Sequence, residues 1–390
     1  MALRTEPVAR LQALPPYLFV DIDRKRRAAI AAGKDVISFG VGDPDLPTHP
    51  FIIERLQQAA TDPANHRYPH DVGSPAFRRA AAAFFSRRYG VSLDAERELL
   101  TLIGTKEGLG HLALAVVNPG SVVLTPDPGY PVYRSATLFA GGEPFVLPLH
   151  ENLDWQPDFS TIPSDVARRS ALLYLNYPNN PTGAAGSKSL LADAIAFCRA
   201  HDIVFCHDAA YNEMCFGEPC QSALEIPGAR DVCVEMHSLS KTFNMTGWRL
   251  GFAAGNADVL ASLARVKANL DSGQFTAIQE AGAAALEGIE RPEVLEARHI
   301  YARRARLLAD GLTQLGFRVR QPRATFYVWA GVPAGLDGMQ VATRLLDEAA
   351  VVCIPGLGFG EQGARFVRFA VTVDESRIRQ ALDRMRSLRW

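Results

Sequence analysis

Residues 237 to 251 read His-Ser-Leu-Ser-Lys-Thr-Phe-Asn-Met-Thr-Gly-Trp-Arg-Leu-Gly, and this stretch decides how the rest of the chain is interpreted. An apolar run, Val232 to Met236, comes directly before it and predicts a buried strand. Lys241 therefore lies just beyond the end of a strand, among small hydroxyl residues. This position marks Lys241 as a candidate functional amine rather than an ordinary surface charge.

The residues around Lys241 are suited to binding a phosphate ester. Ser238 and Ser240 precede the lysine and Arg249 follows it, so neutral and cationic hydrogen-bond donors gather around one amine. A pyridoxal phosphate enzyme needs this combination, because a lysine holds the cofactor's aldehyde as a Schiff base while donors anchor its phosphate. A Ser-x-x-Lys motif on its own also fits a solvated loop at a strand end. The residues at the other strand ends are needed to distinguish a cofactor-binding lysine from such a loop.

The composition is that of a globular chain. Its 390 residues carry a formal net charge of −1, and 48% of them are hydrophobic, which allows one large core or two modest ones. Because acidic and basic residues balance, neither nucleic acid nor an anionic membrane is expected as the main partner. The first residues form no apolar signal core, and no run reaches the roughly 18 apolar residues of a membrane span. We therefore expect a cytoplasmic protein.

Six cysteines are present, and none belongs to a Cys-x-x-Cys pair. Several lie inside apolar runs such as Ile203 to Cys206, as small core hydrophobes do. All six are expected to be reduced: Cys198, Cys206, Cys215, Cys220, Cys233 and Cys353. No metal site is expected.

Short apolar runs alternate with helical patterns from about residue 98 onward, which is typical of crossover units around a mostly parallel sheet. The predicted strands are residues 99–103, 121–124, 172–175, 203–206 and 232–236. The predicted helices among them are residues 107–117, 132–140 and 190–200. In such sheets ligands bind outside the carboxyl ends of the strands, so the residues that follow each strand are candidates for a site.

The two ends of the chain have other patterns. An apolar, proline-bearing arm is followed by a short basic helix, a strand and two helices, at residues 11–19, 22–32, 35–39, 51–60 and 74–88. The C-terminal third has two long helical patterns and two strands, at residues 258–286, 292–315, 326–329 and 366–371. We expect these C-terminal elements to form a lid domain.

Two strand ends offer weaker signals. Thr105 and Lys106 open a helix after Gly104, where free backbone amides and the helix dipole favour a phosphate, although an ordinary N-cap is the commoner explanation. Tyr130 lies in the rigid turn from Pro126 to Pro131, where it could stack on a cofactor ring or pack beneath the turn. Both signals support a cofactor site only in combination with the residues at the other strand ends.

The next two strand ends carry groups that fit a pyridine ring. Asn180, in the segment Asn176 to Gly183, is expected to donate its amide to the ring phenolate oxygen. Asp208 ends a hydrophobic strand, where a carboxylate is costly unless a positive group meets it. A protonated ring nitrogen is such a partner, and Tyr211 would share the phenolate oxygen with Asn180. The alternatives are a plain irregular turn for Asn180 and a helix N-cap for Asp208.

Together, Asn180, Asp208, Tyr211 and Lys241, with gaps of 28, 3 and 30 residues, resemble the signature of class I and II aminotransferases. These are fold type I pyridoxal phosphate enzymes. The resemblance covers nearly the whole chain and includes the specific motif Ser-Leu-Ser-Lys-Thr-Phe-Asn-Met-Thr-Gly-Trp-Arg.

The resemblance implies an α/β fold with two domains. A large domain, residues 45–275, would bind the cofactor and contain a seven-stranded, mostly parallel sheet. A smaller α+β domain would combine residues 1–44, which include the N-terminal arm, with residues 276–390. The same resemblance implies a homodimer whose sites lie between the subunits.

The resemblance also assigns roles to single residues. Lys241 is implied as the Schiff-base lysine and proton carrier, and the residues implied around the phosphate are Ser238, Ser240, Arg249, Thr105 and Lys106. Tyr68 resembles the phosphate-binding tyrosine that the family supplies from the neighbouring subunit. Arg368 resembles the arginine that forms a bidentate pair with the substrate α-carboxylate, although by its strand pattern alone it would face solvent. Gly42 would give a backbone amide to the same carboxylate.

Several stretches resemble the LL-diaminopimelate aminotransferases. They are Pro16 to Phe19, Gly42 to Pro47, Asp127 to Tyr133 and His207 to Tyr211. In that family the tyrosine matching Tyr17 touches the substrate, and a glutamate in the loop after the Tyr68 position can bind the distal amine. Here Asp71 takes that place, one methylene shorter but with the same charge. For both Tyr17 and Asp71, loop packing is the alternative.

The predicted reaction is a ping-pong exchange in which LL-diaminopimelate gives up an amino group and 2-oxoglutarate accepts one, leaving as glutamate. Close alternatives are aminotransferases for aspartate, alanine, aromatic amino acids or N-succinyl-diaminopimelate, and a second distal carboxylate would require a cationic pocket rather than Asp71. A carbon–sulfur lyase on the same scaffold would need no keto acid.

Two more distant alternatives are disfavoured. A non-catalytic regulator would carry an N-terminal DNA-binding domain, for which the short arm before Asp35 is not expected to have room. A P-loop nucleotidase would need a Gly-x-x-x-x-Gly-Lys-Ser/Thr motif, which the sequence lacks.

Overall fold

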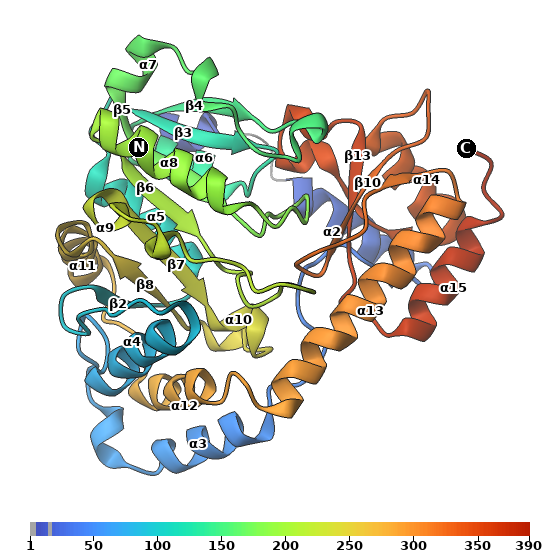
Figure 1. The fold of residues 1–390 in the computed structure, drawn as a ribbon. Coiled ribbons are helices and arrows are strands. Elements are labelled where there is room, and N and C mark those ends of the chain that lie inside the picture. The colour runs from blue at the N-terminus through green and yellow to red at the C-terminus, as the bar shows by residue number, and fades with distance from the viewer. Residues whose placement is uncertain (1–4, 15–17) are drawn as a thin grey trace.

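A seven-stranded sheet forms the centre of the larger of two bodies in the computed structural model, which describes residues 5–14 and 18–390 (Figure 1). The strands lie in the order β2-β8-β7-β6-β5-β3-β4, and only β8 runs antiparallel to its neighbours. Their bounds are β2 Leu99–Leu102, β3 Val122–Asp127, β4 Glu143–Pro148, β5 Ser170–Asn176, β6 Val204–Asp208, β7 Cys233–Ser238 and β8 Gly251–Gly255. This confirms the predicted α/β fold with a seven-stranded, mostly parallel sheet.

Helices cover both faces of this sheet, because strand side chains alternate between two cores. In β5, Leu173 and Leu175 pack into one core, while Leu172 and Tyr174 pack into the other. Helices α4, α8 and α12 contribute to the first core, and α5, α6 and α11 to the second. The helices of this large body are α3 Pro50–Ala60, α4 Pro75–Tyr89, α5 Thr105–Val116, α6 Val132–Phe139, α7 Ser164–Arg169, α8 Lys188–His201, α9 Ala229–Val232, α10 Leu239–Thr242, α11 Ala257–Leu270 and α12 Thr276–Glu287.

The smaller body is built on a four-stranded antiparallel sheet in the order β12-β13-β10-β9. Its strands are β9 Arg318–Val319, β10 Tyr327–Gly331, β12 Ile354–Pro355 and β13 Phe366–Ala370. Its helices are α13 Pro292–Gln314, α14 Gly338–Ala349 and α15 Glu375–Met385. A two-stranded parallel sheet of β1 Ile37–Ser38 and β11 Val351–Val352 ties the N-terminal segment to this small body.

Helix α13 joins the two bodies (Figure 1). Val294, near its start, belongs to a core of the seven-stranded sheet, whereas Tyr301 and Leu308 lie in the core of the small body. The two bodies are therefore connected by one continuous helix as well as by their side-chain contacts.

Residues 258–286 form two helices rather than the continuous one expected. Helix α11 ends at Leu270 and α12 begins at Thr276, and Gly273 between them has a φ of +78°. The Asp271 carboxylate accepts a hydrogen bond from the Gly273 amide at 3.0 Å, which stabilises this turn. Because α12 packs on α3 and α4, its packing favours a domain boundary inside α13 rather than near residue 275. The division into domains stays a proposal.

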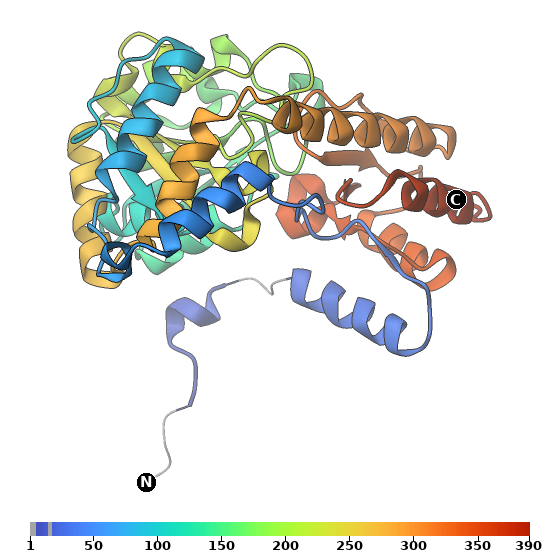
Figure 2. The same cartoon turned by 90° about the horizontal axis from the view of Figure 1, so that it is seen from below.

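Helices α1 (Ala9–Gln12) and α2 (Leu18–Ala31) extend from the two bodies as an arm (Figure 2). No residue of α1 is buried, so this helix has no core of its own. Among the residues that the structure describes, no helix combines the length and the apolar character needed to cross a membrane.

Two of the six cysteines form a disulfide, so the prediction that all are reduced is wrong for Cys215 and Cys220. The physical reason is a short loop that folds back and brings their Cα atoms to 6.0 Å, within the range that a disulfide can bridge. The other four cysteines are free and buried, as expected.

Candidate active site

Lys241 lies on the single turn of α10, directly after β7. Ser238 ends the strand, and its hydroxyl accepts a hydrogen bond from the Ser240 amide at 3.2 Å, which starts this turn. The Lys241 Nζ atom donates to the Gly42 carbonyl at 3.0 Å. Burial lowers the pKa of this amine to about 8, and the nearby Asp43 carboxylate opposes the effect only in part. Lys241 is therefore closer to neutral at physiological pH than an ordinary lysine.

Asp208 ends β6 and is buried. The Tyr133 hydroxyl donates to its Oδ2 atom at 2.8 Å, and the Ala210 amide donates to its Oδ1 atom at 3.2 Å. Burial raises the pKa of the Asp208 carboxyl, while these two hydrogen bonds oppose the rise. A cationic partner would complete the stabilisation of its ionised form. The role of Tyr133 was not predicted.

Asn176, at the end of β5, connects the loops that carry the predicted residues. Its Nδ2 amide donates to the Asp208 carbonyl at 2.6 Å, and its Oδ1 atom accepts from the Asn180 amide at 2.7 Å. The ends of β5 and β6 are thereby fixed relative to each other. Asn176 lines the same cavity as its two partners, and its role was not predicted.

Arg368 enters the site from β13 of the small body, and it is buried rather than solvent-facing. Its guanidinium donates from Nη1 to the Asn180 Oδ1 atom and from Nη2 to the Gly40 carbonyl, both at 2.8 Å. The guanidinium carbon also lies 4.2 Å from the centre of the Tyr327 ring. These contacts fix a planar cation at the edge of the cavity.

Tyr211 and Tyr327 meet across the seam between the two bodies. Their phenolic oxygens lie 2.9 Å apart, and both side chains are buried. Tyr327 also lies close to Gly42, where a Cβ atom would come within 2.0 Å of the Tyr327 hydroxyl oxygen. Position 42 therefore requires glycine for this approach, and Tyr327 is a further residue of the site that was not predicted.

The first turn of α5 faces Arg249 and forms a cradle for an anion. Gly104 precedes the helix with a φ of +76°, and a Cβ atom there would lie 2.2 Å from the Arg249 Nη2 atom. Thr105 and Lys106 follow at the helix N-terminus, where backbone amides have no partner within the helix. Glu107 anchors this turn by accepting hydrogen bonds from the Ile103 amide at 2.9 Å and from a buried lysine, Lys267, at 3.1 Å.

A buried polar network lies beside β6 and β7. The His207 Nδ1 atom is 3.1 Å from a Glu235 carboxylate oxygen, and its Nε2 atom is 2.9 Å from the Tyr177 carbonyl. Ser222 donates to the other oxygen of Glu235. Burial alone would raise the pKa of Glu235, but hydrogen bonds from His207 and His237 outweigh it and hold the pKa well below its usual range. This network supports the strand that presents Asp208.

A cavity of about 270 Å³ brings most of the predicted site residues together. The predicted residues that line it are Gly42, Thr105, Lys106, Tyr130, Asn180, Asp208, Tyr211, Ser238, Ser240, Lys241, Arg249 and Arg368. Five further lining residues had no predicted role: Val41, Asn176, Ala210, Tyr327 and Phe359.

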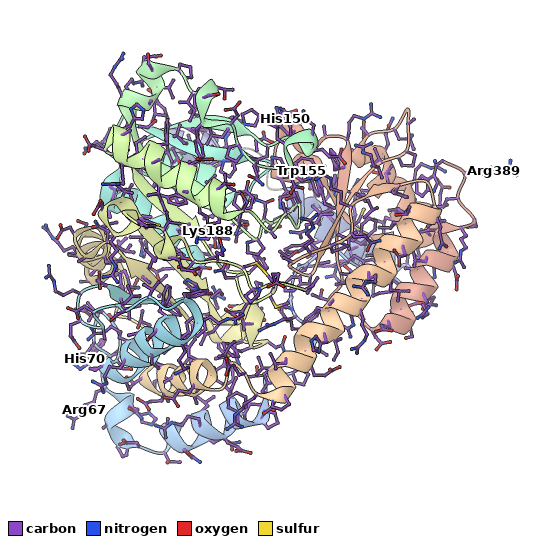
Figure 3. The ribbon with its side chains drawn as sticks, in the orientation of Figure 1. Arg67, His70, His150, Trp155, Lys188 and Arg389 are labelled. Carbon is purple, nitrogen blue, oxygen red and sulfur yellow. A yellow bond between two sulfur atoms is a disulfide. The ribbon has the colours of Figure 1, made fainter. Side chains whose placement is uncertain are left out.

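Two of the predicted residues that the structure describes, Tyr68 and Asp71, do not line this cavity. Tyr68 is 90% exposed, and Asp71 is exposed in the same loop. Figure 3 labels Arg67 and His70 of this loop at the edge of the large body, far from the small body. Tyr17 lies outside the described residues.

The family model for aminotransferase class I and II matches residues 34–385. The chain belongs to the class I and II aminotransferases. The LL-diaminopimelate aminotransferase of Syntrophobacter fumaroxidans is 53% identical over 381 residues, covering 97% of this chain and 98% of that relative. Substrate-bound BacF from Bacillus subtilis has a TM-score of 0.93 at 35% identity, covering 99% of this chain and 98% of that one. A probable N-succinyldiaminopimelate aminotransferase from Thermus thermophilus has a TM-score of 0.90 at 35% identity, covering 95% and 99%.

Aminotransferases of this family use pyridoxal 5′-phosphate, and the residues present fit that cofactor. The cavity combines a buried amine of depressed pKa, Lys241, with a buried carboxyl, Asp208, whose two hydrogen bonds, from Tyr133 and the Ala210 amide, both come from neutral donors. The cradle at Gly104 and Arg249, which a Cβ atom would fill, offers space and positive charge for a phosphate. The chain is a pyridoxal-phosphate-dependent aminotransferase acting on small amino and keto acids.

Proposed function

We propose that this aminotransferase transfers an amino group from LL-diaminopimelate to 2-oxoglutarate by a ping-pong exchange. The observation that carries the proposal is the 53% identity to the LL-diaminopimelate aminotransferase of Syntrophobacter fumaroxidans over nearly the full length of both chains. Relatives of the same name from Moorella thermoacetica and Aquifex aeolicus, at 47% and 45% identity, also support it. The reaction would place the enzyme in lysine biosynthesis.

The acid–base work falls to three residues of the cavity. When bound, pyridoxal phosphate withdraws electrons from the α-carbon of the amino acid and carries the amino group between the two substrates. Lys241 Nζ takes the proton from the donor's α-carbon, and its depressed pKa provides the neutral amine that a base must be. Asp208 accepts a hydrogen bond from the ring N–H and keeps it protonated. Tyr211 donates to the ring phenolate oxygen.

The other cavity residues hold the cofactor. Because Asn180 Oδ1 already accepts from Arg368, its Nδ2 amide is the group that donates to the phenolate oxygen. Tyr130, which lines the cavity, would stack on the ring. The phosphate is held by backbone and side-chain donors from the cradle and the Lys241 turn: Thr105, Lys106, Ser238, Ser240 and Arg249.

Substrate recognition uses both ends of the amino acid. Arg368 forms a bidentate pair with the α-carboxylate, and Gly42 gives a backbone amide to the same group. Tyr17 contacts the substrate beyond the α-carbon. Asp71 pairs with the distal amine of LL-diaminopimelate, a charge that the dicarboxylic alternatives would not favour.

We further propose a cytoplasmic homodimer with its sites between the subunits. The position of Tyr68 supports a dimer, because a large aromatic side chain that is 90% exposed lies outside the cavity of its own chain. Tyr68 would bind the cofactor phosphate of the partner subunit, and Asp71 in the same loop would reach the same site. The two-domain division, with residues 1–44 and most of the C-terminal third in the small domain, belongs to this proposal.

The experiment that tests the donor is glutamate formation by the purified enzyme from 2-oxoglutarate and one donor at a time. The panel is LL-diaminopimelate, aspartate, alanine, phenylalanine, N-succinyl-diaminopimelate and cystathionine, with Lys241→Ala as the inactive control. We expect the highest kcat/KM with LL-diaminopimelate. A higher kcat/KM with another donor would contradict the proposed substrate, and turnover of cystathionine without 2-oxoglutarate would indicate a lyase.

A second experiment tests the distal contact. Asp71→Asn keeps the size of the side chain and removes its charge, so we expect KM for LL-diaminopimelate to rise about tenfold, as loss of one charged hydrogen bond typically does. Activity with alanine, which has no distal amine, should stay the same. An equal loss with both donors would show that Asp71 supports the loop rather than the substrate.

A further inference from the structure

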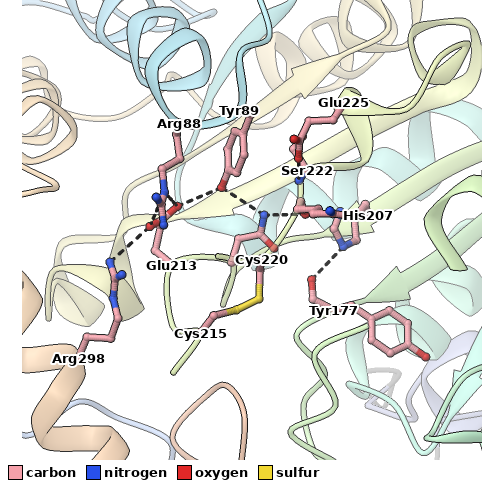
Figure 4. The surroundings of a disulfide bond; sticks show 12 residues. Arg88, Tyr89, Tyr177, His207, Glu213, Cys215, Cys220, Ser222, Glu225 and Arg298 are labelled. Atoms are coloured by element: carbon pink, nitrogen blue, oxygen red, sulfur yellow. Dashed lines mark hydrogen bonds and ion pairs between the residues drawn. A yellow bond between two sulfur atoms is a disulfide. The ribbon is translucent and has the colours of Figure 1, made fainter. Parts of the chain in front are cut away.

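The disulfide between Cys215 and Cys220 closes a short loop at the seam between the two bodies (Figure 4). Cys215 is buried, Cys220 is half-buried, and residues 217–219 between them are exposed. The loop begins four residues after Tyr211, which lines the active-site cavity. A covalent bond that can be broken and remade therefore lies close to the catalytic residues.

The base of this loop is held without the disulfide. The Asn212 Nδ2 amide donates to the Gln221 carbonyl at 3.1 Å and contacts the Tyr89 hydroxyl at 3.2 Å. Glu213 accepts from the Arg88 guanidinium at 2.9 Å (Figure 4). Breaking the disulfide would therefore loosen the chain around Cys215 while Asn212 and Glu213 keep their place.

The chain around Cys215 also makes backbone hydrogen bonds to the small body. The Thr325 amide donates to the Met214 carbonyl at 2.9 Å, and the Phe216 amide donates to the Arg323 carbonyl at 2.8 Å. Cys215 is the residue between these two hydrogen bonds, and it pairs with Ala324. The disulfide is thus attached to the central residue of a short antiparallel ladder.

The ladder leads directly to the active site. Its small-body strand continues to Tyr327, whose amide donates to the Thr325 hydroxyl at 3.0 Å. The Tyr327 hydroxyl is the group that meets Tyr211 at the seam. Only two or three residues therefore separate residues 214–216 from the cavity, so a change in the mobility of these residues would affect the position of Tyr327.

The surroundings of the disulfide favour thiol chemistry. A pocket of about 480 Å³ is lined by both cysteines, by three exposed cationic side chains, those of Lys188, Arg306 and Arg323, and by one exposed carboxylate, Glu218, so positive charge is in excess. Figure 3 labels Lys188 at the start of α8. Nearby positive charge stabilises a thiolate, which is both the attacking and the leaving form in thiol–disulfide exchange. The pocket gives a small thiol access to the half-buried Cys220 sulfur.

We propose that Cys215 and Cys220 form a reversible thiol–disulfide exchange site whose state controls how firmly residues 214–216 hold the small-body segment 323–325 beside the active site. The reductant is a dithiol. Its first thiolate forms a bond to the Cys220 sulfur, the Cys215–Cys220 bond breaks, and Cys215 leaves as a thiolate. The second thiolate of the reductant then attacks the mixed disulfide and releases the Cys220 thiolate. Two electrons pass from the dithiol, which becomes a cyclic disulfide, to the pair.

The proposed cytoplasmic location favours a reversible disulfide over a permanent one. Disulfides of cytoplasmic proteins are usually transient, catalytic or redox-sensing rather than permanent. The four remaining cysteines are buried in the cores, so they do not compete for a reagent in the folded protein. The Cys215–Cys220 pair is therefore the redox-active group that a mild dithiol would reach among the described residues.

The test compares the oxidised and the dithiol-treated holoenzyme by thiol labelling and amide hydrogen exchange. We expect no rapidly labelled thiol before treatment and two after it, both in the peptide that contains residues 215–220. Hydrogen exchange should become faster in residues 214–217 and also in residues 322–326, while β6 stays unchanged. Absence of the two new thiols, or unchanged exchange in residues 322–326, would overturn the proposal.

Two variants distinguish an effect of the disulfide from an effect of changing the loop sequence. The double variant Cys215→Ser/Cys220→Ser should match the reduced enzyme under oxidising and reducing conditions alike. Pro219→Ala, which keeps both thiols, should retain the response to the dithiol. For turnover, we expect reduction to change kcat/KM by about fivefold, the lower end of typical coupling between linked sites. A double variant that behaves like the oxidised enzyme in hydrogen exchange would also refute the proposal.

Discussion

The phenolic oxygens of Tyr211 and Tyr327 lie 2.9 Å apart, and this contact joins the segment after β6 in the large body to β10 in the small body. Both hydroxyls are buried, so neither can exchange its partner for bulk water without movement of the two bodies. The relative position of the bodies is thereby coupled to a residue of the cofactor site. The contribution of this contact to stability can be measured by replacing either tyrosine.

Tyr327→Phe should lower the free energy of unfolding by about 1 kcal/mol, because it leaves the Tyr211 hydroxyl without its partner. Tyr211→Phe should have a similar effect. Because both changes remove one shared hydrogen bond, the double variant should lose less than the sum of the two single losses, as measured by chemical denaturation. Additive losses would contradict a direct interaction.

The depressed pKa of Lys241 predicts its reactivity in the cofactor-free protein. An amine reacts in its neutral form, so labelling of Lys241 by an amine reagent should increase with pH around a midpoint of about 8. The midpoint for a lysine model peptide is about 10.4. Asp43→Asn should lower the midpoint further, because the Asp43 carboxylate raises the pKa of Lys241. Peptide mass spectrometry measures the labelling, with the exposed Lys34 as a reference for reagent activity.

Tyr133 should set the acid side of the pH–activity profile. Its hydrogen bond to Asp208 lowers the pKa of that carboxyl, so Tyr133→Phe should raise the pKa of Asp208. Since Asp208 works in its ionised form, the acid limb of kcat/KM should move to higher pH. Tyr174→Phe is the matched control, because its hydroxyl donates to the Leu109 carbonyl instead of to Asp208. An unshifted acid limb in Tyr133→Phe would exclude this role.

Arg368→Lys should weaken amino-acid binding while it leaves cofactor binding intact. A lysine keeps the charge but cannot reproduce the two parallel donors of the guanidinium, so we expect KM for the donor to rise about 10- to 100-fold. Steady-state kinetics measure this change, and cofactor titration provides the control. An amine donor without an α-carboxylate should react equally well with both enzymes, and an equal loss with such an amine would contradict the assignment.

Much of the cavity could be predicted from sequence because its residues follow hydrophobic strands. Asp208 and Lys241 come after β6 and β7, and the carboxyl ends of parallel strands meet at one edge of a sheet. Tyr327 was missed because it lies in an apolar run, Phe326 to Trp329, in which an aromatic residue indicates only core packing. Tyr133 and Asn176 were missed because their roles depend on partners distant in sequence.

Other features depend on geometry that a single sequence does not specify. The spacing of Cys215 and Cys220 does not reveal the distance between their Cα atoms, which decides whether a disulfide can form. Strand β8 was not predicted because Gly251 to Gly255 consists of two glycines, two alanines and one phenylalanine, a short run with little strand propensity. The break between α11 and α12 was not predicted because helical patterns lie on both sides of Gly273, and only the positive φ of this glycine shows that the helix is interrupted there.

Helix α13 acts as a lever between the two bodies. Its start is embedded beside the seven-stranded sheet and its remainder in the core of the small body, so a rotation of the small body would tilt the helix as one rod. With 23 residues at about 1.5 Å each, the rod is about 34 Å long, and a tilt of about 5° displaces its far end by about 3 Å. A small angular adjustment at Val294 would thus become a displacement comparable to the length of a hydrogen bond at the other end of the helix.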